Sequence, residues 1–188
     1  METLFAPWRM QWVNRDRPED GSASGCTFCS LPGGDDRTNN IVAKSDHCYV
    51  LLNNMPYNPG HSMIIPFDHK QSLLTLTDEV LLDYMKTTQI VLEALQEALT
   101  PSGYNIGCNI GTAGGASIPD HLHTHVIPRW ESDTSFMPLT ANTTIVEEAL
   151  DETYDRLRDT LLENDVTEPL SNSEAIRIDG TGESPHGA

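Results

Sequence analysis

The chain has 188 residues, enough for one compact domain with a hydrophobic core and too few for two full domains. Its 28 acidic residues outnumber its 11 basic residues, and the formal net charge is -17. Such a surface repels nucleic acid and anionic membranes, so neither is expected as a partner. Only three of the basic residues are lysines, and an acidic, lysine-poor surface stays hydrated at molar salt, which predicts a halophilic source.

The cysteines and the apolar stretches predict where the protein works. Cys26 and Cys29 form a Cys-x-x-Cys pair, whereas Cys48 and Cys108 are scattered, unlike the even framework of a small secreted scaffold. No apolar run follows a basic N-terminal start, and the longest apolar stretches are far shorter than a membrane span. We therefore expect a cytoplasmic protein in a reducing compartment.

Hydrophobic periodicity and turn residues predict the elements in chain order. They are strands at about 41–44, 47–53 and 62–66, a helix at about 77–99, strands at about 104–110 and 121–127, and a helix at about 144–164. Thr77 is typical of a helix N-cap, and two acidic residues follow it in the first turn. This order of elements predicts an α+β fold with an antiparallel sheet. From residue 164 onward polar residues, glycine and proline dominate, which predicts a disordered acidic tail over residues 164–188.

Three histidines occupy alternate positions in the strand predicted at about 121–127. They are His121, His123 and His125, and they alternate with Leu122, Thr124 and Val126. In an extended chain the three imidazoles point to one face and the other three side chains point into the core. Neighbouring imidazoles would lie about 7 Å apart, a spacing that favours a row of different roles over three ligands of one metal.

A small-residue loop, Gly111-Thr112-Ala113-Gly114-Gly115-Ala116-Ser117, precedes the histidines, and a second segment reads Pro59-Gly60-His61-Ser62-Met63-Ile64-Ile65-Pro66. With the histidine row, these segments resemble the histidine triad (HIT) family. The stretches 6–9, 120–123, 128–130 and 133–137 resemble its diadenosine polyphosphate phosphorylase and hydrolase-like branch. The resemblance covers roughly residues 4–160 and implies a HIT domain over residues 1–163, with residues 164–188 as the tail.

The resemblance also implies a reaction. The middle histidine, His123, would attack the α-phosphorus of a nucleoside polyphosphate and form a nucleotidyl-histidine, which water or inorganic phosphate then resolves. His125, the Ser117 hydroxyl and the backbone N–H groups of the 114–117 loop would meet the charge that develops on the phosphate oxygens. His61 would orient the site.

Substrate-binding positions follow from the same resemblance. Asn53 would hold the ribose hydroxyls, and Phe28 and Met63 would line the base pocket. Phosphate contacts would come from Asn109, Gly115, Ala116 and Ser117. Trp130 would cover the site or form part of a dimer surface. A homodimer and a nucleoside polyphosphate substrate are implied as partners.

The Cys26–Cys29 pair has two interpretations. A redox motif should open a helix within a βαβ pattern, and none is visible in the sequence. Zinc-bearing members of the family complete a structural site with one histidine after the second segment and the first histidine of the triad. The resemblance therefore implies zinc ligands at Cys26, Cys29, His69 and His121.

Two other functions stay open at this stage. One is a non-catalytic HIT-fold module that binds nucleotides, and the other is a metallohydrolase in which the histidine row holds a catalytic zinc. The segment Ser132-Asp133-Thr134-Ser135-Phe136 departs from the Gly-Asp-Thr-Asn-Phe common in the phosphorylase-like branch, and Ala116 stands where a glycine is usual. The choice between phosphorolysis and hydrolysis therefore stays open.

Overall fold

The computed structural model describes residues 25–131, 133 and 149–179, and within them the chain forms one seven-stranded sheet. The strands are β1 (Ile41–Lys44), β2 (Cys48–Leu52), β3 (Ser62–Pro66), β4 (Gly103–Cys108), β5 (Thr124–Arg129), β6 (Thr167–Pro169) and β7 (Ile176–Ile178), and they lie in the order β4-β5-β3-β2-β1-β7-β6. All neighbouring pairs are antiparallel except β1 and β7, which are parallel. The predicted α+β fold is therefore confirmed, with one parallel pair that the sequence did not predict.

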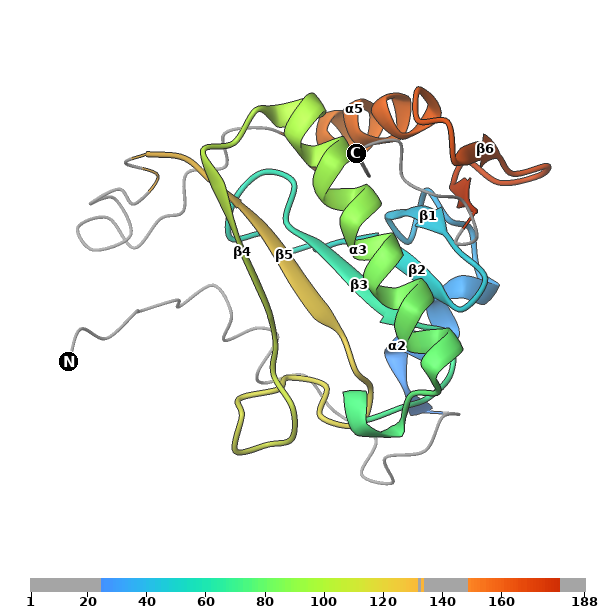
Figure 1. The fold of residues 1–188 in the computed structure, drawn as a ribbon, viewed down its shortest axis with the longest axis vertical. Coiled ribbons are helices and arrows are strands. Elements are labelled where there is room, and N and C mark those ends of the chain that lie inside the picture. The colour runs from blue at the N-terminus through green and yellow to red at the C-terminus, as the bar shows by residue number, and fades with distance from the viewer. Residues whose placement is uncertain (1–24, 132, 134–148, 180–188) are drawn as a thin grey trace.

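The long helix α3 (Asp78–Leu99) lies across one face of the sheet (Figure 1). Its N-cap is Thr77, whose hydroxyl accepts a hydrogen bond from the Val80 N–H, as predicted. The Tyr84 hydroxyl lies 3.0 Å from the Ile64 carbonyl of β3 and 2.7 Å from the Thr124 hydroxyl of β5. The helix is thereby joined to the two strands that carry the histidines.

A second helix, α5 (Leu150–Leu162), packs beside α3 over β1 and the C-terminal strands (Figure 1). Tyr154, Leu157 and Leu161 are buried in the same core as Val91 and Leu95 of α3. The start predicted for this helix, at about residue 144, lies outside the described residues. Among those residues, no helix is long and apolar enough to cross a bilayer.

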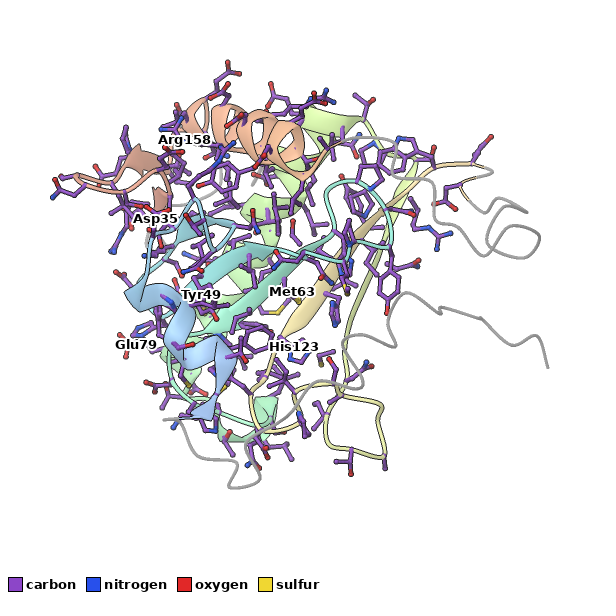
Figure 2. All side chains as sticks on the ribbon, turned by 180° about the vertical axis from the view of Figure 1, so that it is seen from behind. Asp35, Tyr49, Met63, Glu79, His123 and Arg158 are labelled. Carbon is purple, nitrogen blue, oxygen red and sulfur yellow. The ribbon has the colours of Figure 1, made fainter. Side chains whose placement is uncertain are left out.

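The opposite face of the sheet is covered by the one-turn helix α2 (Thr27–Ser30) and the short 3-10 helix η3 (Leu31–Gly33). Figure 2 shows Tyr49, Met63 and His123 on this face, which α3 does not cover. A second apolar cluster lies here, made of Phe28, Ile41, Tyr49, Leu51, Met63, Ile65 and Ala175. The face that carries the histidine side chains is therefore lined by apolar side chains.

Two sequence predictions are wrong in detail. Strand β5 begins at Thr124, not at residue 121, because the Leu122 N–H donates to the Lys70 carbonyl outside the sheet. The tail predicted to be disordered from residue 164 forms β6 and β7 instead. The polar composition hid the alternation Ile176-Arg177-Ile178, in which both isoleucines are fully buried. The sheet therefore extends beyond the boundary expected at residue 163, while residues 180–188 lie outside the described residues.

Candidate active site

Three of the predicted histidines come together at the neighbouring strands β3 and β5. His61 immediately precedes β3, His125 lies within β5, and Met63 of β3 pairs with His125 in the strand register. His123 comes just before β5, and its ring centroid lies 5.1 Å from that of His125. The side chains that alternate with the histidines, Leu122, Thr124 and Val126, are buried, as predicted. His121 does not join the row, because its ring is turned toward Cys26 and Cys29.

The backbone of its own segment holds His123 in one tautomer. Its Nδ1 lies 2.8 Å from the His121 carbonyl, which accepts hydrogen bonds only, so Nδ1 carries the proton. In the neutral ring Nε2 then carries the lone pair. The side chain is 2% exposed, and burial lowers the pKa of His123 below its usual value while the hydrogen bond to His121 opposes this effect. The neutral imidazole, the form that can attack phosphorus, is therefore favoured at neutral pH.

Hydrogen bonds behind His125 give it the opposite tautomer. The Tyr57 backbone N–H donates to Nδ1 of His61 over 3.1 Å, so the proton of neutral His61 is on Nε2. That Nε2 lies 2.9 Å from Nδ1 of His125 and donates to it. Neutral His125 therefore carries its own proton on Nε2. Adjacent imidazoles thus present a lone pair from His123 and an N–H from His125.

Phe28 packs directly against the nucleophile candidate. Its ring lies 5.0 Å from that of His123 and 5.7 Å from that of His121, and it is 4% exposed. The Tyr49 hydroxyl donates to the Phe28 carbonyl over 2.7 Å, which fixes helix α2 on the sheet. Phe28 and Met63 belong to the same apolar cluster, which agrees with their prediction as neighbours on one wall. Their contact with a base stays a prediction.

Asn53 lies at the end of β2, beside His61. Its side-chain Nδ2 lies 3.4 Å from Nδ1 of His61, and its Oδ1 accepts from the Met55 N–H over 3.0 Å. The side chain therefore shapes the turn that follows β2. The predicted contact with ribose is a separate role, and no described contact tests it.

The loop between β4 and β5 folds on itself through its glycines. Gly115 has a φ of +82°, and a Cβ on Gly114 would lie 2.5 Å from the Ile110 carbonyl oxygen, so both positions require glycine. Asn109 Nδ2 donates to the Gly115 carbonyl over 3.5 Å and closes the loop. Ser117, which ends it, is half-buried. The phosphate contacts of Asn109, Gly115, Ala116 and Ser117 stay predictions.

Trp130 follows the end of β5, five residues beyond His125. An extended chain covers about 16 Å in five residues, so Trp130 lies well along the strand from the histidines. Its backbone N–H donates to the Asp133 carboxylate over 3.2 Å. Its predicted roles, over the site or at a dimer surface, are not tested by the described contacts.

The four predicted metal ligands gather into one cluster. One ligand atom each from Cys26, Cys29, His69 and His121 lies within 4.8 Å of the others. Cys29 Sγ lies 3.1 Å from Nδ1 of His69 and 3.4 Å from Nδ1 of His121, and Cys26 Sγ lies 3.3 Å from the same His121 atom. Tetrahedral zinc with bonds of about 2.3 Å to sulfur and about 2.0 Å to nitrogen requires ligand separations of roughly 3.5 Å. The cluster therefore fits zinc.

The protonation of the cluster also suits a metal. His121 Nε2 donates to the Pro66 carbonyl over 2.9 Å, which leaves its Nδ1 lone pair facing the cysteines. Burial is the main cause that lowers the pKa of His121 to about 4, so the ring is neutral at pH 7. Burial, with the adjacent Cys26 thiol, raises the pKa of Cys29 to about 11. A cation at this place would reverse that effect and favour the thiolate.

A cavity of about 560 Å³ lies elsewhere, between the C-terminal parts of α3 and α5. Its charged lining residues are Glu93, Glu97, Glu163 and Asp165. None of the predicted site residues lines this cavity, and its acidic walls would repel phosphate. The histidine site is therefore the better candidate for nucleotide chemistry.

Sequence reasoning missed three residues that hold this site. Tyr49 fixes helix α2, Tyr57 sets the His61 tautomer through its backbone N–H, and Asn58 bonds to the far end of β5. The Pro-rich turn at 55–60 was a signal for Tyr57 and Asn58, since a rigid turn before His61 limits its backbone. Nothing in the sequence singles out Tyr49 from other strand residues.

The fold is α+β, and its sheet carries a buried neutral imidazole, a second imidazole N–H and a glycine-rich loop. These features are typical of proteins that carry out nucleophilic chemistry at phosphate. The HIT domain matches residues 35–132, and the chain is 33% identical over 158 residues to the AP-4-A phosphorylase of Mycobacterium tuberculosis, covering 81% of this chain and 80% of that protein. The chain therefore belongs to the HIT family.

Other similarities agree with this assignment. The bis(5'-adenosyl)-triphosphatase of Saccharomyces cerevisiae is 34% identical over 97 residues, which cover 50% of this chain and 46% of that enzyme. A hypothetical histidine triad nucleotide-binding protein from Sulfolobus tokodaii superimposes with a TM-score of 0.57 at 27% identity, over 73% of this chain and 90% of that one. A zinc-bound histidine triad protein from Mycobacterium smegmatis gives a TM-score of 0.61 at 24% identity, over 76% and 96% of the two chains, and supports the fold alone.

Proposed function

We propose that this protein is an enzyme that cleaves diadenosine polyphosphates through a covalent nucleotidyl-histidine on His123. The observation that carries the proposal is the hydrogen bond from His123 Nδ1 to the His121 carbonyl, because it leaves the Nε2 lone pair available. The names of the relatives from Mycobacterium tuberculosis and Saccharomyces cerevisiae support this substrate class.

The reaction has two displacements at one phosphorus. In the first, His123 Nε2 forms a bond to the α-phosphorus, and the bond from phosphorus to the bridging oxygen breaks with its electron pair. The leaving nucleotide polyphosphate departs as an anion and needs no proton. In the second, an oxygen of water or phosphate attacks the same phosphorus, the pair returns to Nε2, and the nucleophile loses its proton to solvent.

His125 has a different task in this scheme. Its Nε2–H donates a hydrogen bond to a phosphate oxygen, where negative charge grows as Nε2 of His123 attacks. The Ser117 hydroxyl supplies a further donor. The N–H groups of Gly115 and Ala116 donate to the Thr112 and Gly111 carbonyls within the loop, over 3.0 and 3.3 Å, and hold it beside the phosphate chain. These donors offset the repulsion between a phosphate chain and a protein with a net charge of -17.

The remaining contacts position the nucleoside. Phe28 and Met63 form the apolar wall for the base, Asn53 bonds to the ribose, and Asn109 supports the phosphate loop. Trp130, at the end of β5, covers the site or forms part of the dimer surface. These assignments rest on the family pattern together with the burial of Phe28 and Met63 beside the histidines.

Incubation with diadenosine tetraphosphate at high salt, with and without inorganic phosphate, tests the reaction. Phosphorolysis yields ATP and ADP, and hydrolysis yields ATP and AMP. A His123→Ala variant serves as the control. Absence of turnover in the unaltered protein, or turnover that survives His123→Ala, would contradict the nucleophile and favour a module that only binds nucleotides.

The metallohydrolase interpretation has less support. Within residues 25–131, 133 and 149–179, the only group of at least three potential metal ligands is the Cys26, Cys29, His69 and His121 cluster. His123 and His125 each direct Nδ1 to another hydrogen-bond partner, at the His121 carbonyl and at His61. The histidine row is therefore better suited to nucleophilic attack than to holding a metal.

We infer that Cys26, Cys29, His69 and His121 hold a structural zinc ion. A bound zinc would draw α2 and the His121 segment together and would leave no open position for water. Because the His121 carbonyl accepts the hydrogen bond from His123 Nδ1–H, the same cluster steadies the nucleophile. Metal analysis of the purified protein tests the assignment, with one zinc per chain expected.

We also infer a homodimer through the edge strand β4. Its residues Asn105, Ile106 and Gly107 are exposed, and Ile106 has 51% of its surface accessible. An exposed edge with an apolar side chain favours pairing with a second copy. Light scattering should give a dimer that Ile106→Asp dissociates, whereas Leu74→Asp, at a side chain 94% exposed elsewhere, should leave it intact.

The expected environment is a reducing cytoplasm at high salt. All four cysteines are free thiols in the structure, and the acidic surface suits molar salt. Unfolding followed from low to molar potassium chloride tests the halophilic part. A stability that does not rise with salt would contradict it.

A further inference from the structure

A clamp at the far end of β5 holds the turn that precedes His61. The Asn58 side chain donates through Nδ2 to the Pro128 carbonyl over 2.9 Å and to Asp133 Oδ2 over 2.8 Å. An amide has two N–H donors, and these two acceptors use both of them. The turn between β2 and β3 is therefore tied to β5, the strand beside β3 in the sheet.

Asp133 is itself fixed as a charged acceptor. Arg129 donates to both of its oxygens, from Nε over 2.5 Å and from Nη2 over 2.6 Å, and the Trp130 N–H adds a third donor. The Arg129 guanidinium holds the pKa of Asp133 at about 2, and the side chain is only 11% exposed. Asn58 therefore bonds to a carboxylate that stays in one place and one charge state at neutral pH.

The clamped turn leads directly to the His61 ring. The Asn58 carbonyl accepts the His61 N–H over 3.1 Å, and the neighbouring Tyr57 donates its N–H to His61 Nδ1. The Tyr57 and His61 rings stack with centroids 5.0 Å apart. Gly60 has a φ of +76°, and a Cβ there would lie 2.5 Å from a Leu99 methyl carbon, so the turn also packs tightly on α3.

We propose that Asn58, held by Asp133, is a positioning residue that fixes the tautomer of His61 and through it the N–H that His125 presents to substrate. The part of this inference that concerns substrate rests on the proposed function. The Tyr57 N–H is the closer of the two donors at His61 Nδ1, since Asn53 Nδ2 lies 3.4 Å away. Without the clamp the turn moves, His61 samples both tautomers, and His125 loses its fixed donor.

Nitrogen-15 NMR of the histidine rings tests this directly, because it reports which ring nitrogen carries the proton. In the unaltered protein we expect Nε2–H on His61 and His125 and Nδ1–H on His123. In Asn58→Ala the His61 and His125 signals should move to values averaged between tautomers, while His123 keeps its own. Asn105→Ala is the matched control. Asn105 Oδ1 accepts a hydrogen bond from Arg129 Nη1 over 2.7 Å, so this variant also removes a hydrogen bond to the Arg129–Asp133 pair, but Asn105 lies in β4, outside the turn.

Turnover supplies the second arm of the test. We expect kcat to fall on the order of tenfold in Asn58→Ala with little change in KM, as for loss of an orienting group. Unchanged tautomers, or changed tautomers with an unchanged kcat, would overturn the inference. If the unaltered protein shows no turnover, the proposed function fails, and the NMR arm still decides whether Asn58 positions His61. Asp133→Asn, which keeps the shape of the side chain, should shift the same signals if Asn58→Ala does not fold.

Discussion

His123 and His125 stand side by side with ring centroids 5.1 Å apart, and their hydrogen bonds give the two rings opposite tautomers. One ring ends in a lone pair and the other in an N–H, although both side chains are imidazoles. The difference arises behind the site, from the His121 carbonyl in one case and from His61 in the other. The His121 carbonyl and the His61 ring therefore determine which atom each of the two histidines presents.

Replacing either ring should have different consequences. His123→Ala should abolish turnover of diadenosine tetraphosphate, because no other described lone pair is held at that place, whereas His125→Gln keeps an N–H donor and should lower kcat by a factor of roughly 10 to 1,000. Mass spectrometry of rapidly quenched protein should detect added AMP in the unaltered chain and in His125→Gln. An adduct that persists in His123→Ala would refute the assignment.

Removing a ligand of the proposed zinc site should weaken the fold. Cys29→Ser deletes one of the two proposed sulfur ligands, and a chelator should have a similar effect on the unaltered protein. Because metal binding is coupled to folding, we expect a loss of several kcal/mol in the free energy of unfolding, measured by thermal denaturation together with zinc analysis. Cys108→Ser is the matched control, since this half-buried cysteine lies outside the cluster. Equal losses in both variants would argue against zinc.

Much of the fold could be predicted because it depends on local patterns. The helix was expected at 77–99 and is found at Asp78–Leu99, since its apolar spacing and its N-cap are both local signals. Strands β1 and β3 were predicted with the correct ends for the same reason. The C-terminal hairpin was not, because its two buried isoleucines lie within a polar segment and gain their stability from β1, more than 130 residues earlier.

The site divides in a similar way. The histidines stand out in the sequence, and the metal cluster could be expected only through the family resemblance, since Cys26 and His121 are 95 residues apart. The clamp between Asn58 and Asp133 also joins distant positions, 75 residues apart, and neither has a spacing that marks it. Long-range hydrogen bonds of this kind depend on tertiary structure, and a single sequence does not show which distant residues they join.

Asp133→Asn should make stability less dependent on acid pH. The folded pKa of Asp133, about 2, is below its ordinary value of 3.8, so the ionised carboxylate stabilises the fold above about pH 4, and this contribution is lost as the pH falls toward 2. Solvent around Arg129, which is 39% exposed, reduces the effect to about 1 kcal/mol at pH 7. Denaturant unfolding at several pH values should show the two proteins converging below pH 4. Asp151→Asn, at an exposed carboxylate 3.7 Å from Arg37, should change stability by less than about 0.5 kcal/mol.

Tyr49→Phe should loosen helix α2 without opening a large cavity. The variant removes only the hydroxyl that donates to the Phe28 carbonyl, a fully buried bond, and leaves that carbonyl without its donor. A buried acceptor left unpaired costs about 1–3 kcal/mol, so the free energy of unfolding should fall by that amount. Because Phe28 lies in the chain between the two proposed cysteine ligands and touches the His123 ring, zinc affinity and kcat should fall together. Tyr104→Phe is the control, since its half-buried hydroxyl bonds to α3 away from the site, and it should change stability but neither zinc affinity nor kcat. If Tyr49→Phe binds zinc and turns over substrate as the unaltered protein does, the position of α2 does not affect the function of the histidines.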